Sequence, residues 1–407
     1  MAQRRRTHNK SKIRSLDAER ARRLRERAKS TPTRASKAKR KAGKFDFTLF
    51  LVVLLLMLFG IVMVFSSSYY YALTNSNFNN DMYYFVKRQI MWSGLGICAM
   101  IFLMNFPYRI IKNFTFIAYI FAIACLILVL IVGIEGNGSK RWLGIPNTSI
   151  GFQPSEVAKI VVILYLSNYI SSHKGILGTV KGFIKCCVIL FVPVVLIAVE
   201  NLSTAIVVTG IGVCILFVAS PKVWYFFAAA VPVGILGVAA VTMPKFAYRF
   251  DRIKYWLDPF SDPTDKGFQI IQSLYAVASG GFFGLGIGQS RQKTYVPEPY
   301  NDIIFAIICE ELGMFGAAVV ILLFAILVCR GIKIAMNAED TFGSLCATGI
   351  TALIGIQAII NIAVATNTMP NTGMALPFIS YGGSGMVFTL SSMGILLNIS
   401  RYQRGRE

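Results

Sequence analysis

The feature that most constrains this chain is a series of apolar stretches, each close to the length needed to cross a bilayer. A membrane-spanning helix needs about 20 mainly apolar residues. Hydrophobic residues make up 55% of the 407 positions and charged residues 15%, too few to cover a water-soluble globule. We therefore expect an all-α polytopic membrane protein with about ten transmembrane helices, 157–170 being the shortest. The stretches are 47–65, 90–106, 114–133, 157–170, 183–199, 205–219, 223–243, 303–329, 342–365 and 378–399.

The N-terminal arm, residues 1–45, has a different composition. Residues 1–44 hold 18 Lys or Arg against 3 Asp or Glu, a net charge of +15 out of +22 for the chain. Without an apolar run this arm is expected to be disordered, and it is no secretory signal. Basic segments stay in the cytoplasm, so both the arm and, after an even number of spans, the tail 401–407 are predicted to be cytoplasmic. We expect the arm to attract anionic lipids, not nucleic acid.

Metal and disulfide chemistry find little support in the sequence. The eight cysteines lie in or beside apolar stretches without a CxxC spacing, and the two histidines are His8 and His173. We expect no disulfide, zinc or haem site. The topology predicts outer loops at 67–88, 134–154, 200–201, 244–301 and 366–377, which hold most of the unusual polar residues. The large loop 244–301 lies between helices 7 and 8. Function is therefore expected on the outer face.

Loop 134–154 carries Lys140 and Arg141 on the outer side, against the usual bias of basic residues toward the cytoplasm. Arg141 offers a planar fork for phosphate oxygens. Trp142 next to it can lie against a sugar or in the headgroup zone. The alternative is that Trp142 is an ordinary interfacial residue. For Arg141 we favour a role in binding.

The next helix is predicted to open at Pro154-Ser155-Glu156, with Lys159 one turn further on. A helix start presents free backbone N–H groups to an anion, and Lys159 shares a helix face with Ser155. The alternative makes Ser155 an N-cap and Glu156 a partner of the helix dipole, with Lys159 reaching out to water. We favour function for Lys159.

Asp302 follows a long polar segment and directly precedes an apolar helix. A carboxylate at such a border is open to tuning of its pKa. Along an ideal helix Glu310 would lie about 12 Å deeper and within about 80° of the Asp302 face, with Glu311 nearly opposite. Ionisable groups inside a bilayer are expensive. Glu310 and Glu311 are therefore candidates for a structural hub or a proton relay.

The rest of the outer face has weaker signals. Loop 244–301 carries both charge signs, which favours ion pairs over an electrostatic funnel. Its glycines at 280, 281, 284, 286 and 288 are explained better by close packing than by phosphate binding, because no Lys-Ser/Thr follows. In the last loop, Pro370, Pro377 and the glycines at 382, 383 and 385 are expected to break the helix and free backbone groups for binding.

Taken in order and spacing, these motifs resemble the FtsW, RodA and SpoVE family of bacterial division, shape and sporulation proteins, over residues 47–401. The wording around Gln289 and Pro297 is most similar to the Gram-positive FtsW and SpoVE branch. The motifs are Lys140-Arg141-Trp142, Gln153-Pro154-Ser155-Glu156 with Lys159, Gln272-Ser273, Ser279-Gly280-Gly281, Pro297-Glu298, Asp302 to Ala306 with Glu310-Glu311-Leu312-Gly313, and Leu376 to Gly383.

The resemblance implies an enzyme that polymerises lipid II during division, extends an undecaprenyl-linked glycan and releases undecaprenyl pyrophosphate. It also implies a class B penicillin-binding protein as partner, within the division machinery at the septum. The catalytic acid of the family falls on Asp302. The chain departs from the family at Glu200-Asn201-Leu202-Ser203-Thr204, where Pro-Asp-x-Gly-Thr is frequent, and at Tyr300-Asn301. Substrate-binding residues are expected to be Arg141, Trp142, Gln153, Ser155, Glu156, Lys159, Arg249, Gln272, Ser273, Glu298, Ser380, Gly382 and Gly383.

We assign Asp302 as the base toward the acceptor hydroxyl, with Arg141, Lys159 and Arg249 near the pyrophosphate. No cofactor is required by the sequence, although Mg or Mn can share the leaving-group role. Two alternatives remain open: a lipid II flippase or other transporter, which Glu310 and Glu311 favour, and a non-catalytic scaffold of the division machinery. The sequence leaves division, sporulation and elongation undistinguished.

Overall fold

The structure is a computed structural model that describes residues 43–136, 139–144, 151–228, 234 and 247–403. The predicted basic arm, apart from its last three residues, and most of the tail lie outside these residues. Within them, eight helices are long and apolar enough to span a bilayer, which confirms an all-α polytopic membrane protein. They are α2 (Phe47–Thr74), α3 (Tyr84–Asn105), α4 (Tyr108–Val132), α6 (Val180–Glu200), α7 (Leu202–Ala219), α11 (Ile304–Asn337), α12 (Thr341–Ala365) and α13 (Gly383–Ser400).

A further long helix is α5 (Pro154–Ser172), which replaces the short stretch predicted at 157–170. It starts earlier because Pro154 occupies its first turn, where the missing N–H costs nothing. The apolar stretch was predicted to begin only at residue 157, because Ser155 and Glu156 in the first turn are polar. The predicted span 223–243 falls largely outside the described residues.

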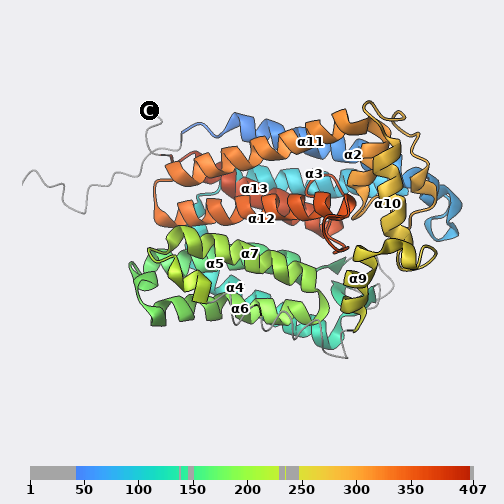
Figure 1. The fold of residues 1–407 in the computed structure, drawn as a ribbon. Helices are drawn as coiled ribbons and strands as arrows, with labels where there is room; N and C mark the ends of the chain where they lie inside the picture. The colour runs from blue at the N-terminus through green and yellow to red at the C-terminus, as the bar shows by residue number, and fades with distance from the viewer. Residues whose placement is uncertain (1–42, 137–138, 145–150, 229–233, 235–246, 404–407) are drawn as a thin grey trace, which may run out of the picture. The chain divides into compact units, whose positions relative to one another are not determined.

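Helices distant in sequence pack side by side in the bundle (Figure 1). α11 packs on α2 and α12, and α13 packs on α3. α5 lies among α4, α7 and α12, and α6 packs on α7. Two shorter helices, α9 (Ala247–Leu257) and α10 (Phe268–Ser279), lie at one end of the bundle, where α10 contacts α11 and α12. Short 3-10 helices lie in the connections that the structure describes: η1 (Ser76–Phe78), η2 (Ile176–Gly178), η4 (Pro259–Ser261) and η5 (Gln292–Thr294).

The loop expected at 134–154 contains a small antiparallel sheet that the sequence analysis did not anticipate. Its strands β1 (Ile134–Gly136), β2 (Ser139–Gly144) and β3 (Gly151–Phe152) pair in the order β1-β2-β3. Strands this short carry little alternation of polar and apolar residues, although the Asn-Gly dipeptide at 137–138 is a hairpin signal. The sheet brings Leu143 opposite Phe152, beside the start of α5.

The connection between α2 and α3 is much shorter than the outer loop predicted at 67–88, because α2 continues to Thr74 and α3 begins at Tyr84. The serines after residue 65 looked like the end of a span. They are buried in the bundle, and the hydroxyl of Ser67 donates to the carbonyl of Met63 in the preceding turn. Buried serines that bond to their own helix do not end it.

Candidate functional site

Asp302 lies in the turn just before α11 and is half-buried. Its carbonyl accepts a hydrogen bond of 2.7 Å from the side-chain amide of Asn361 on α12, which also donates to the carbonyl of Met374. The backbone of Gly373, in the loop between α12 and α13, faces the carboxylate: a Cβ there would lie 3.7 Å from Oδ2 of Asp302. The aspartate is therefore held between the end of the large loop and the loop that joins α12 to α13.

The surroundings of Asp302 raise the pKa of its carboxyl above the usual range. The main cause is burial, and the charge of Glu298 acts in the same direction. Its own backbone N–H and the charge of Arg252 act in the opposite direction. Arg252, on α9, also donates to the carbonyl of Asn371 at 3.2 Å. The sequence analysis selected Arg249 on the same helix; its side chain is outside the described part of the chain, so that choice stays a prediction.

The loop before Asp302 is fastened by the predicted residue Ser380. The hydroxyl of Ser380 donates to the carbonyl of Asn301 at 2.7 Å and accepts from the backbone N–H of Leu376. Gln89 of α3 then bridges onward: its side chain donates to the carbonyl of Ser380 and accepts from the N–H of Gly382. Ser380 and Gly382 thus link the Asp302 turn to the start of α13.

Two other predicted residues of the large loop, Ser273 and Glu298, also have identifiable contacts. The hydroxyl of Ser273 is buried and donates to the carbonyl of Ala365 at 2.9 Å, which joins α10 to α12. Gln272 is half-buried on the same helix. Glu298 has a positive φ of 52° and accepts from the side-chain amide of Asn301 at 2.6 Å. These contacts shape the turn that carries Asp302.

A second polar centre lies at the start of α5. Gln153 is the N-cap but makes no side-chain cap bond, so the expected alternative of Ser155 as the cap is wrong. Lys159 is 3% exposed and its ammonium lies 2.8 Å from the Glu156 carboxylate, so it does not reach out to water. The hydroxyl of Ser155 is buried and has no partner among the described residues.

The start of α13 lies against this centre. The helix begins at Gly383 without a side-chain cap. The hydroxyl of Ser384 is buried and unpartnered within the described residues. A Cβ at Gly385 would lie 3.5 Å from Oε2 of Glu156, and one at Gly383 would lie 3.5 Å from the indole nitrogen of Trp92. Two uncapped helix starts with two unpaired hydroxyls can accept an anion.

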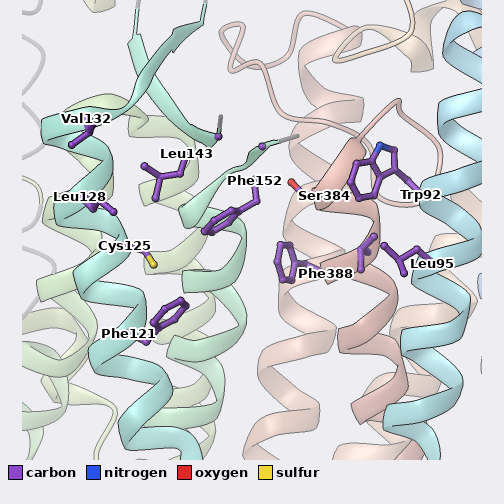
Figure 2. A pocket seen from close by; sticks show the side chains of 13 residues that line it. Trp92, Leu95, Phe121, Cys125, Leu128, Val132, Leu143, Phe152, Ser384 and Phe388 are labelled. Carbon is purple, nitrogen blue, oxygen red and sulfur yellow. The ribbon is translucent and has the colours of Figure 1, made fainter. Parts of the chain in front are cut away.

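An apolar groove of about 740 Å³ opens beside these helix starts (Figure 2). Ser384 points from α13 into the gap, and Phe152 of β3 lies opposite. Phe121 and Leu128 line the wall formed by α4. The groove can hold a long hydrocarbon chain with its polar end at the helix starts. Its lining residues are Trp92, Leu95, Phe121, Cys125, Leu128, Val132, Leu143, Gly144, Gly151, Phe152, Ser384, Val387 and Phe388.

The remaining cation of the sequence analysis, Arg141, donates to the carbonyl of Glu200 at the end of α6 at 3.3 Å. Its neighbour Trp142 is exposed. The described contacts thus form two polar centres, one at Asp302 and one at Lys159. Gln89 and the segment from Ser380 to Ser384 connect them.

Glu310 and Glu311 are both fully buried, and they bond to the same stretch of the large loop. The sequence analysis placed Glu310 within about 80° of the Asp302 face and Glu311 nearly opposite, on a helix that runs through Asp302. That extrapolation does not apply, because Asp302 lies in the turn before α11, which begins at Ile304.

Several contributors to the site were missed by the sequence analysis. Asn361 is a buried amide inside an apolar span, a signal that was available. Gln89 likewise sat at the edge of a span. Arg252, Trp92 and Ser384 carry no local signal, because their importance arises from helices packed together in three dimensions.

The fold and site define a polytopic membrane protein with the half-buried Asp302 carboxylate and an apolar groove on the same bundle. The sequence model of the FtsW, RodA and SpoVE family, described as cell cycle protein, matches residues 46–405, and the chain belongs to this family.

Two curated relatives cover most of the chain. Stage V sporulation protein E of Bacillus subtilis is 42% identical over 364 residues, which are 88% of this chain and 98% of that protein. A probable peptidoglycan glycosyltransferase FtsW of Geobacter sp. (strain M18) is 38% identical over 371 residues, 90% of this chain and 99% of that protein.

Two solved structures share the fold. One belongs to a peptidoglycan synthase complex described as coordinating polymerization and crosslinking, with a TM-score of 0.74, 24% identity, and coverage of 89% of this chain and 99% of that one. The other is the rod shape determining protein RodA of Thermus thermophilus, with a TM-score of 0.65, 23% identity, and coverage of 88% and 98%. At these identities the comparison establishes the fold.

Proposed function

We propose that this protein is a peptidoglycan glycosyltransferase that polymerises lipid II into glycan strands during cell division and releases undecaprenyl pyrophosphate. The observation that carries the proposal is the half-buried Asp302 carboxyl, with its raised pKa, on the same bundle as an apolar groove that ends at two uncapped helix starts. The names of the FtsW relatives point to the same reaction.

Asp302 acts as the general base. As the acceptor sugar hydroxyl attacks the anomeric carbon of the donor, its proton passes to the Asp302 carboxylate, a new C–O bond forms, and the bond from the anomeric carbon to the pyrophosphate oxygen breaks. A base works best when its pKa lies near the working pH. Burial raises the pKa of Asp302 in that direction, and Arg252 keeps the carboxylate form accessible.

The leaving pyrophosphate takes the negative charge that develops in this step. The starts of α5 and α13, the hydroxyls of Ser155 and Ser384, and the buried Lys159 are arranged to hold it. The hydrocarbon tail lies in the groove. In this arrangement Glu156 keeps Lys159 in place, and Arg141 binds from the rim of the sheet.

On this proposal, a divalent cation that assists the reaction is carried largely by the substrate. Among the described residues no three His, Cys, Asp or Glu side chains gather into a metal site. Magnesium in proteins is often held by one or two carboxylates together with substrate phosphates and water. Asp302 with the diphosphate would fit that pattern, and a titration of polymerisation with EDTA and then Mg or Mn tests it.

The proposal includes a partner and a place. A class B penicillin-binding protein would crosslink the new strands, as the related synthase complex couples polymerization to crosslinking. Both termini would lie in the cytoplasm, with the basic arm on anionic lipids and the protein at the septum.

The transporter alternative depends on Glu310 and Glu311 as proton carriers. Both carboxylates are bonded by fixed donors from the large loop, an arrangement that suits an anchor better than a relay. Purified protein in liposomes with fluorescent lipid II separates the alternatives, because polymer on a gel and label crossing the bilayer are independent readouts. We expect polymer. Label crossing without polymer would contradict the proposal, and neither signal, in the presence of the partner, would favour a scaffold.

A further inference from the structure

α11 is interrupted at Gly313, whose φ of 66° and ψ of −167° are not helical. The interruption frees backbone groups inside an apolar span, where each needs a partner. The segment 281–286 supplies those partners and runs alongside the helix. Gly284 has no room for a side chain, because a Cβ would lie 2.2 Å from the carbonyl of Glu311. The hydrogen bonds are Leu285 N to Glu310 O at 2.9 Å, Gly286 N to Glu311 O at 2.9 Å, Met314 N to Gly281 O at 2.9 Å and Phe315 N to Phe282 O at 3.1 Å.

Just beyond this segment the loop wraps around the Glu310 carboxylate. The carboxylate accepts a short bond from the hydroxyl of Ser290, a bond of 2.9 Å from the N–H of Arg291, and longer ones from the N–H of Gln292. Glu310 is 0% exposed. Among the described residues, these donors reach both oxygens of the carboxylate.

Glu311 is also 0% exposed, and it is paired with a cation. The ammonium of Lys293 lies 3.1 Å from its Oε1 and also donates to the carbonyl of Gly288 at 2.6 Å. The same ammonium lies 4.7 Å from the ring centre of Tyr69, and Ser66 of the same helix donates to Glu311 at 2.5 Å. Lys293 therefore joins α2, α11 and the large loop at one buried point.

This buried point lies close to Asp302 along the chain. Only residues 294–301 separate Lys293 from Asp302, and Asp302 in turn leads directly into α11. The short segment is thus tied to α11 at both ends: by the ion pair with Glu311 at one end and by the chain itself at the other. Val296 and Tyr300 within it are buried, so it has little freedom to adjust independently.

We propose that Lys293 is a positioning residue for Asp302: its buried pair with Glu311 fixes the segment that carries the carboxylate. Lys293 itself does not touch the substrate. The inference rests on the proposed function insofar as Asp302 is the base of the polymerase. A loss of about 1 Å in the placement of a catalytic group can slow a reaction by about 10²-fold.

The test compares Lys293→Met, Lys293→Arg and Lys266→Met in polymerisation of lipid II by monodisperse protein. Lys266 is the matched control, because it forms an exposed ion pair with Asp251 elsewhere in the same loop. We expect K293M to lower kcat about 10²-fold with KM changed less than about twofold, since the base moves and the donor site does not. K293R, which keeps the charge, should recover most of the loss, and K266M should match the wild type.

A double-mutant cycle with Glu311→Gln tests whether Lys293 acts on Asp302 through its ion pair with Glu311. If Lys293 acts through Glu311, K293M with E311Q costs no more than K293M alone, because both remove the same pair. E311Q is nearly isosteric and carries the kinetic test by itself if K293M does not fold: the proposal then requires a lower kcat at unchanged KM.

Folded K293M with a normal kcat, an equal loss in K293R, or additive losses in the cycle would overturn the positioning role. A wild-type protein that makes no polymer would instead sink the proposed function. The two failures are thus distinguishable.

Discussion

Two carboxylates eight residues apart have opposite environments. Asp302 is half-buried in a turn, where burial raises its pKa and its own backbone N–H is the hydrogen-bond donor to its carboxylate. Glu310 is fully buried and is bonded by a hydroxyl and two further backbone N–H groups of the large loop. An acid that must exchange protons keeps its oxygens available, whereas an acid that anchors a loop gives them all to fixed donors.

The comparison predicts that Asp302 matters for rate and not for folding. Asp302→Asn should lower kcat for polymerisation by on the order of 10³-fold, the range expected for loss of a general base. Because burial disfavours the charged form of Asp302, a neutral amide removes a small cost near pH 7, so the variant should melt at the wild-type temperature or above. Polymerisation assays and thermal unfolding in detergent check both parts. A wild-type polymerisation rate for Asp302→Asn would contradict the catalytic role that distinguishes Asp302 from Glu310.

Glu310 should behave in the opposite way. Glu310→Ala leaves the hydroxyl of Ser290 and the N–H groups of Arg291 and Gln292 buried without an acceptor. Stranding a buried polar network of this kind costs about 3 kcal/mol or more. Thermal unfolding should show a clear loss of stability, with Asp302→Ala as the matched carboxylate deletion. Equal melting temperatures for the two deletions would show that Glu310 is not an anchor.

A substitution in the apolar groove is expected to have a smaller effect, on KM. Leu128 lines it on α4, and Leu128→Trp would displace part of a bound hydrocarbon chain. Losing burial of two methylene groups, at about 0.8 kcal/mol each, raises KM roughly tenfold. The control is Ile117→Trp, an exposed position of the same helix outside the groove lining. An equal effect of both substitutions, or the same penalty for a short-chain lipid II analogue, would exclude the groove as the tail site.

Whether a feature of the fold could be predicted from the sequence depends on how far apart in the chain the interacting residues lie. The apolar spans and the position of Asp302 at a helix border follow from local composition, and both were predicted. The short sheet at Ile134–Gly144 was missed, because its strands are set by pairing and not by their own residues. The continuation of α2 past Ser66 was missed for a related reason, since those serines are buried by neighbouring helices.

The site shows the same limit. Sequence reasoning selected Lys159 and Glu156 but did not show that they pair, nor that Gln89 and Ser380 link the Asp302 turn to the start of α13. It also did not single out Arg252, whose charge lowers the pKa of Asp302. The sequence indicated which types of residue belong to the site. It did not indicate which of them contact one another across the bundle.

The most direct test of the central claim is the pH dependence of kcat/KM, because Arg252 and Glu298 act on the pKa of Asp302 in opposite directions. The acid limb should lie above the ordinary range of an aspartate, since burial raises this pKa and the protonated form cannot act as a base. Arg252→Met should move the limb to higher pH, and Glu298→Gln should move it to lower pH. A limb that stays in place, or that moves the same way in both variants, would contradict Asp302 as the base.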